Sequence, residues 1–299
     1  IHFKELDINE KYRLLEDSWM SLRINQISLD DFMDLLSLYK HEKDKNIWAL
    51  VSGIFSTIYK IFPDRNLGNF IGRYCKPILE VLGKEYNENS SQEESQLRSI
   101  VCGLYAKYSD DKEFNNYFVG LFETNKYEEY NDGNYYNLVL SIAGMDQSVS
   151  VTKYLDKFIQ AETPQIEGRY RSMLWGLSDP KTPEIVLNAI LEGTIRGADA
   201  PYIVSGLISN TENGEAAWII VKDNWDNLLQ VMPEWTSSRI LDGLPSIYNE
   251  VLGNDIEKFV ESNPLPSAEK ITKQKIERLN ANINFKNLII NSLKKTKFE

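Results

Sequence analysis

The chain has 299 residues, 42% of them hydrophobic and 26% charged, which is typical of a soluble globular protein with room for two domains or one repeat domain. Its net charge of −11 argues against binding to nucleic acid or to anionic membranes, because both attract basic surfaces. No apolar run reaches the roughly 18 residues of a membrane span, and no export signal opens the chain.

The first half of the chain shows apolar residues at helical spacing, and no run alternates for long enough to predict a strand. Ser28, with Asp31 three residues on, is predicted to cap a helix. The two cysteines, Cys75 and Cys102, are too few for a disulfide framework, so we expect buried thiols and a cytoplasmic protein. The helical stripes run over residues 14–22, 32–39, 48–58, 78–82, 97–105 and 114–121.

The second half continues the helical pattern. The loop 179–183 is predicted to lead into a new helix, with Thr182 as its cap and Pro183 as its first residue. Residues 215–229 form the clearest amphipathic stripe and are predicted to be one helix. Its tryptophans, Trp218 and Trp225, lie two turns apart, and we expect both of them in the core.

Helical stripes of this length, separated by short turns, are typical of antiparallel helix pairs. Their spacing agrees loosely with the period of about 40 residues found in HEAT-like and armadillo-like repeats. We therefore predict an all-α fold, a superhelix of stacked antiparallel helix pairs whose concave face would bind a ligand. A compact helical bundle remains an alternative, because no strict internal consensus supports the repeat.

Catalytic motifs are not evident in the sequence. A metalloprotease helix needs two histidines four residues apart, but only His2 and His41 exist, and Lys45 stands four residues after His41. There is no Cys-x-x-Cys pair, phosphate-binding loop or nucleophile elbow. Acidic pairs are numerous and most are expected on solvated helix faces, although a glycosidase-like carboxylate pair remains open. We predict no metal or cofactor site in this chain.

Several blocks of the sequence resemble, in order and spacing, the terminal helical domain of zinc aminopeptidases of the aminopeptidase N type. The final block is similar to puromycin-sensitive aminopeptidases and archaeal tricorn-interacting factors. Together the blocks cover roughly residues 9–290. They are 11–22, 27–48, 168–180, 195–225 and 259–283, and the fourth of these, which ends in Lys222-Asp-Asn-Trp225, is the best match.

This resemblance implies a domain that covers the active site of a preceding catalytic domain and encloses a cavity for the peptide. It also implies that zinc is held by the missing catalytic domain, so this chain alone is expected to be inactive. The partners implied are that catalytic domain of the same polypeptide and a peptide substrate. Residues 1–8 are expected to be the remnant of a preceding linker, and residues 9–299 the domain, so a fragment or processed product is expected.

The resemblance also implies a substrate-binding residue, Arg239, which matches a family arginine that faces the internal cavity. Thr236 stands where some relatives have a tyrosine, and it is the second predicted contact. Arg239 lies in what looks like the first turn of a helix, where a cation opposes the helix dipole and needs a carboxylate partner. A structural salt bridge is the alternative role. Arg196 and Arg169 are weaker candidates, for which inter-helix ion pairing is the stronger alternative.

The sequence thus predicts the C-terminal domain of a zinc aminopeptidase that supports N-terminal trimming of peptides. The alternative is a stand-alone helical-repeat scaffold that binds a protein or peptide on its concave face. A third possibility, a stand-alone hydrolase of its own kind, has no motif in its favour.

Overall fold

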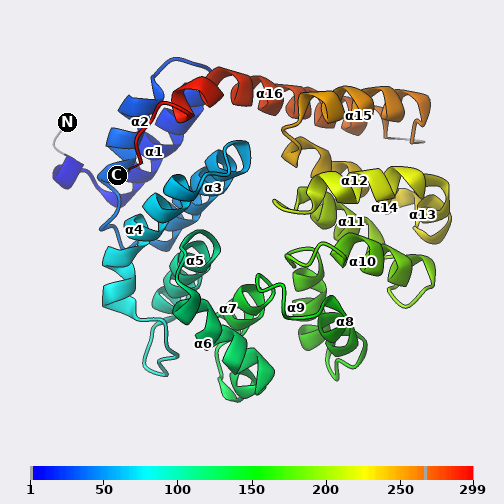
Figure 1. Ribbon diagram of the computed structural model, residues 1–299, viewed down its shortest axis with the longest axis horizontal. Helices are drawn as coiled ribbons and strands as arrows, with labels where there is room; N and C mark the ends of the chain where they lie inside the picture. The colour runs from blue at the N-terminus through cyan, green and yellow to red at the C-terminus, as the bar shows by residue number, and fades with distance from the viewer. Residues whose placement is uncertain (1–2, 266–267, 299) are drawn as a thin grey trace. The chain divides into compact units, whose positions relative to one another are not determined.

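A computed structural model of the protein describes residues 3–265 and 268–298, and every regular element in these ranges is a helix (Figure 1). The chain divides into two compact units. The first unit comprises Ile1–Ala143 and Phe285–Glu299, and the second comprises Gly144–Asn284. The all-α prediction is confirmed.

The first unit stacks helices in pairs. Helix α4 packs on α5 and α6 on α7, while α3 contacts α5 and α5 contacts α7, so alternate helices form one layer. Its elements are η1 Phe3–Glu5, α1 Ile8–Arg23, α2 Leu29–Ser37, α3 Lys45–Ile61, α4 Arg65–Leu82, α5 Gln92–Tyr108, α6 Lys112–Glu123, η2 Lys126–Glu129 and α7 Gly133–Ala143.

The second unit repeats this arrangement. Helices α8, α10 and α12 contact one another in succession, as do α9, α11 and η3. Its elements are α8 Val151–Ile159, α9 Pro164–Leu174, α10 Thr182–Leu191, α11 Ala200–Ser209, α12 Gly214–Asp223, α13 Trp225–Val231, α14 Glu234–Ser237, η3 Ser238–Ser246, α15 Glu250–Ser262 and α16 Glu269–Leu293. From Phe285 onward α16 belongs to the first unit. Both units therefore confirm the prediction of stacked helix pairs.

Local capping explains where several helices begin. The Ser28 hydroxyl accepts a hydrogen bond from the Asp31 backbone, which confirms the predicted N-cap of α2. A capping box starts α1 at Asp7 and another starts α5 at Ser91, where side chains pair reciprocally with backbone N–H groups. These helix starts therefore depend on side chains within the same few residues of the chain.

The core of the first unit holds both cysteines. Cys75 and Cys102 are free thiols with no exposed surface, as predicted. Burial raises the pKa of both thiols, that of Cys102 to about 12, because the thiolate is poorly solvated there. Aromatic side chains pack edge to face in the same unit, with the Tyr74 ring 5.0 Å from that of Phe55.

Two local predictions are wrong. Residues 215–229 are not one helix, because α12 ends at Asp223 and α13 begins at Trp225. Asn224 interrupts the run with φ −112° and ψ 18°, and its side-chain amide donates to the Ile220 carbonyl at 2.9 Å. Thr182 is the first residue of α10 rather than its cap, which is Lys181. In both places a polar side chain gave an ambiguous boundary signal.

The described helices include none that is both long enough and apolar enough to cross a membrane. The proposed division into a linker over residues 1–8 and a domain over residues 9–299 remains a prediction. Phe3 lies within the proposed linker, and its ring packs 4.8 Å from that of Tyr39.

Candidate functional site

The two landmark tryptophans of the second unit lie in its core, as predicted. The ring centroid of Trp218 is 5.6 Å from that of Phe259 on α15, and that of Trp225 is 5.4 Å from it, both edge to face. These contacts join α12 and α13 to α15, and each tryptophan is almost fully buried. The tryptophans therefore position the chain that follows α13, where the predicted site residues lie.

After α13 ends at Val231, Pro233 with its extended backbone is the N-cap residue of the short helix α14. Because α14 is only four residues long and continues into the 3-10 helix η3, residues 234–246 form one tight, irregular turn. Thr236 lies on α14 and Arg239 in the first turn of η3. The structure thus places the two main predicted residues on one short segment.

Arg239 is the exposed member of this pair. Its side chain is 58% exposed, and its Nη1 lies 3.5 Å from Asp242 Oδ2, a long and weak contact. Asp242 has a closer partner in Lys275 of α16, whose Nζ is 2.8 Å from Oδ1. The carboxylate expected to offset Arg239 is therefore present but is shared with Lys275. Most of the guanidinium donors face solvent and could bind an anionic group.

Thr236 is buried, unlike Arg239. Its hydroxyl donates to the Pro233 carbonyl at 3.2 Å, and its backbone N–H donates to the same carbonyl at 3.0 Å. The side chain therefore closes the turn on itself and fixes the path from Pro233 to Arg239. The structure does not bring Thr236 and Arg239 to one accessible surface.

Trp235 is a neighbour that sequence reasoning missed. It is 82% exposed, the most exposed large apolar side chain among the described residues, and it lies four residues before Arg239. A tryptophan left in water on an otherwise polar turn is typical of a contact surface. In the sequence, Trp235 directly follows Pro233-Glu234 and lies outside any amphipathic stripe. This position was the one indication that its side chain is exposed.

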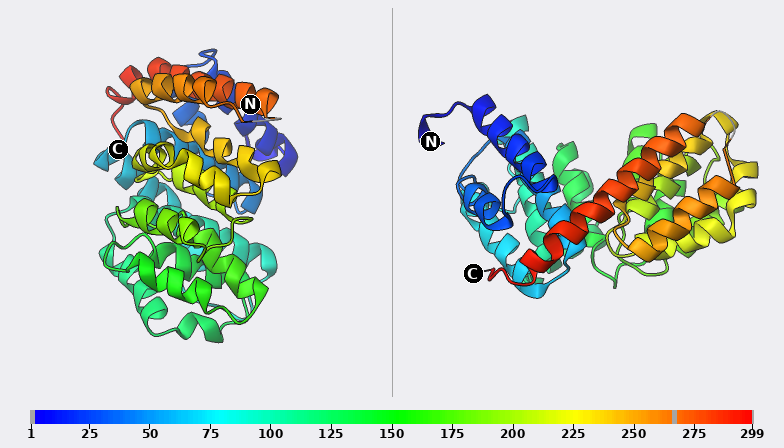
Figure 2. Two further views of the ribbon diagram at one scale, coloured as in Figure 1. Left: turned by 90° about the vertical axis from the view of Figure 1, so that its right-hand side faces the viewer. Right: turned by 90° about the horizontal axis from the view of Figure 1, so that it is seen from above.

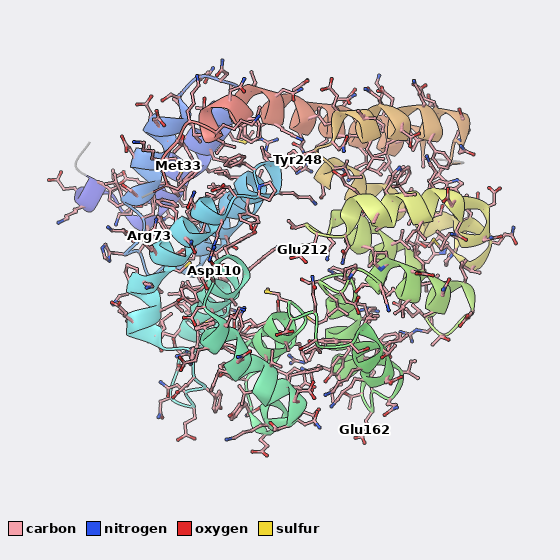
Figure 3. All side chains as sticks on the ribbon, in the orientation of Figure 1. Met33, Arg73, Asp110, Glu162, Glu212 and Tyr248 are labelled. Atoms are coloured by element: carbon pink, nitrogen blue, oxygen red, sulfur yellow. The ribbon has the colours of Figure 1, made fainter. Side chains whose placement is uncertain are left out.

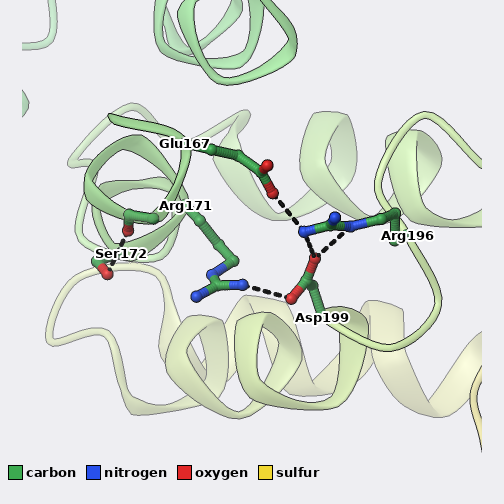
Figure 4. Close-up of polar contacts among 6 residues, drawn as sticks. Glu167, Arg171, Ser172, Arg196 and Asp199 are labelled. Carbon is green, nitrogen blue, oxygen red and sulfur yellow. Dashed lines mark hydrogen bonds and ion pairs between the residues drawn. The ribbon is translucent and has the colours of Figure 1, made fainter. Parts of the chain in front are cut away.

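Arg196 lies in a different cluster, a four-residue ion network (Figure 4). Buried Asp199 accepts from Arg171 Nη1 at 2.5 Å and from Arg196 Nε at 3.0 Å, and Arg196 also pairs with Glu167 of α9. The hydrogen bond to Asp199 raises the pKa of Arg196 above its ordinary value. Arg196 thus makes an ion pair, as in its alternative role, but from the loop before α11 to α9 rather than between two helices.

Arg169 lies half-buried on α9, and Arg171, two residues on, is the α9 arginine that contacts Asp199. The network ties α9 to the loop before α11. Its charges are already matched within the cluster, so its geometry favours a stabilising role over recognition of a ligand.

The donor set for a zinc ion is not found in residues 3–265 and 268–298, which hold no group of three His, Cys, Asp or Glu side chains able to bind a metal. The exposed His41 is followed by Glu42, whose Oε1 pairs with Lys11 Nζ at 2.7 Å. The described residues therefore do not fit a zinc ion, and no chemical step is assigned to one within this chain.

Comparison with known proteins gives a consistent set of relatives. Aminopeptidase M1-B of Oryza sativa subsp. japonica is 25% identical over 93% of this chain and 33% of its own length. Aminopeptidase M1 of Arabidopsis thaliana is 24% identical over 96% of this chain and 33% of its own length. Mitochondrial aminopeptidase 2 of Saccharomyces cerevisiae is 21% identical over 94% of this chain and 31% of its own length.

The chain therefore spans about a third of the length of the curated relatives it matches. Residues 1–281, nearly the whole chain, match the family described as ERAP1-like C-terminal domain. The resemblance to the terminal helical domain of aminopeptidases is confirmed, and the chain belongs to the ERAP1-like C-terminal domain family.

Proposed function

We propose that this chain is the C-terminal domain of a zinc aminopeptidase, and that it covers the active site of a preceding catalytic domain and encloses the peptide cavity. The family match over residues 1–281 carries this proposal. Relatives about three times as long are named aminopeptidases, which supports a catalytic domain elsewhere on the polypeptide. Zinc would be held by that domain, and the isolated chain would be inactive.

Arg239 is the residue proposed to contact the peptide, through a carboxylate of the substrate. Its exposure and its long contact with Asp242 support this role, because little must be broken before a ligand binds. Exposed Trp235 would add apolar contact area beside it. Thr236 would act by fixing the turn that presents Arg239. Arg196 and Arg169 would stabilise α9 and its surroundings.

The cytoplasm is the proposed compartment, because Cys75 and Cys102 are free thiols and a reducing environment keeps them so. Peptides and the catalytic domain are the proposed partners. The chain's acidic balance, with 44 acidic and 33 basic residues, supports neither nucleic acid nor an anionic membrane as a partner.

The first test is the polypeptide upstream of Ile1. The proposal requires a His-Glu-x-x-His helix and a later glutamate there, together with aminopeptidase activity that the 299-residue chain lacks when purified alone. An upstream region without that helix would refute the proposal. A native polypeptide that lacked the His-Glu-x-x-His helix and bound a protein partner through this chain would support the helical-repeat scaffold instead.

The second test is Arg239→Ala in the active polypeptide. Loss of a hydrogen bond to a charged group predicts that kcat/KM falls about 10- to 100-fold for a peptide substrate. Aminoacyl chromogenic substrates, which have no distant carboxylate, should change about threefold at most on the same free-energy scale. Arg278→Ala, which removes another exposed arginine of the second unit, is the matched control. Equal losses for the two variants would remove Arg239 from the proposal.

A further inference from the structure

A groove lies between α15 and α16 in the second unit, and neither Arg239 nor Thr236 lines it. The two helices run side by side (Figure 2). They meet closely where Gly253 faces Ile283, since a Cβ atom on Gly253 would collide with the Ile283 Cδ1. Beyond this crossing, near the loop that joins them, they leave a groove of about 680 Å³.

The floor of the groove is apolar. Val260 of α15, Leu265 of the connecting loop and Ile276 of α16 line it, each less than a tenth exposed. Exposed Pro264 extends this surface at the loop end. A groove of this size, open and apolar at its base, has room for a few side chains of a ligand.

The rim of the groove is acidic. Glu257 and Glu261 stand on α15, and Glu269 and Glu277 stand on α16, while Lys273 is the one base lining it. Four carboxylates and one ammonium give a formal charge of −3 around the apolar floor. No ion pair among the described residues involves any of the four glutamates.

Helical spacing explains why these charges gather. Glu269, Lys273 and Glu277 are four residues apart on α16, so they form one row along the groove, with Ile276 beside them. Glu257 and Glu261 form the facing row on α15 by the same spacing. A row of two glutamates on α15 and a Glu-Lys-Glu row on α16 thus flank an apolar strip, and the net negative charge of the two rows favours a further cation.

We propose that this groove binds a short basic amphipathic peptide segment, with apolar side chains on Val260 and Ile276 and Lys or Arg side chains on Glu261 and Glu277. The apolar side chains of such a segment would pack on the floor of the groove, and its basic side chains would pair with the acidic rim. Phosphates, fatty-acid carboxylates and acidic peptides carry the wrong sign for this rim.

The test uses a fluorescein-labelled peptide of twelve residues with leucines on one helical face and lysines on both sides of it. Fluorescence anisotropy follows its binding to the 299-residue chain, and to the longer polypeptide where the chain is part of one. A matched peptide with glutamates in place of the lysines should not bind. Equal binding of the two peptides would overturn the proposal.

Substitution of the rim glutamates tests whether the peptide binds in this groove. Glu261→Gln with Glu277→Gln should weaken binding about tenfold at low ionic strength, as expected for two partly desolvated ion pairs. The matched control is Glu162→Gln with Glu212→Gln, two exposed glutamates of the second unit that do not line the groove (Figure 3). An equal effect of both double variants would mean attraction to the net charge alone, and would overturn the proposal.

A variant that is expected to bind the peptide more tightly serves as a further test, because misfolding would weaken binding and not strengthen it. Lys273→Gln removes the one base from the rim and should tighten binding about two- to fivefold, the range of one exposed ion pair. Binding that weakens or stays constant in this variant would contradict the inference. Binding to the isolated chain but not to the longer polypeptide would assign the groove to another part of that polypeptide, and would equally overturn it.

Discussion

Two tryptophan-bearing segments of the second unit, close together in sequence, have opposite surroundings. Trp218 and Trp225 on α12 and α13 are buried against Phe259, whereas Trp235 on α14 is 82% exposed. The first pair stabilises helix packing, and the exposed residue lies four residues before Arg239, the main predicted contact for substrate. The most conspicuous sequence feature thus locates the core, and the adjacent short turn carries the candidate site.

The largest expected effect comes from the buried side of this comparison. Trp218→Ala should lower the free energy of unfolding by about 3–5 kcal/mol, because it leaves a cavity between α12 and α15. Urea denaturation followed by circular dichroism measures it. Trp235→Ala is the control and should change the same quantity by less than about 0.5 kcal/mol. Similar losses for the two variants would refute the division into core and surface.

The ion network should give an intermediate effect. Asp199→Asn leaves Arg171 and Arg196 without the carboxylate they share, so we expect a loss of about 1–3 kcal/mol in unfolding free energy. The lower end of this range applies if water screens the charge of Arg196, whose side chain is mostly exposed. Glu192→Gln, an exposed change nearby, should be close to neutral. A neutral Asp199→Asn would show that the cluster does not stabilise the unit and would reopen a binding role for Arg196.

The smallest expected effects on the free energy of unfolding come from the two cations that contact Asp242. Lys275→Met should cost about 1 kcal/mol, because its ion pair is short and only partly exposed. Arg239→Met should cost less than about 0.5 kcal/mol, since its contact is long and its side chain mostly exposed. Thermal unfolding at low and high salt measures both. If Arg239 proved the more stabilising, the structural salt bridge considered for it would be the better explanation.

The helical pattern was readable in the sequence because helix formation depends on local spacing and capping. The stripe from Trp48 to Ile58 lies within α3, and the Ser28 cap forms as its residue type predicts. Boundaries that depend on competing hydrogen bonds were not readable. Asn224 breaks the 215–229 stripe by donating to Ile220, although the apolar pattern continues past it.

The site was only partly readable. Arg239 could be located because the family blocks before it fixed its position in the alignment. The sequence did not show that its expected partner, Asp242, lies closer to Lys275 of α16. Trp235 gave little signal, since an exposed and a buried tryptophan look alike in a sequence. The groove between α15 and α16 depends on the close crossing at Gly253 and Ile283, which joins residues thirty positions apart.

The two buried cysteines give the chain a native chemical reporter. Both lie in the first unit, and the sequence contains no others. An alkylating reagent needs an accessible thiolate, and burial with a raised pKa denies it one at neutral pH. The rate at which mass is added to Cys75 and Cys102 would therefore time the opening of the first unit alone, with no engineered label.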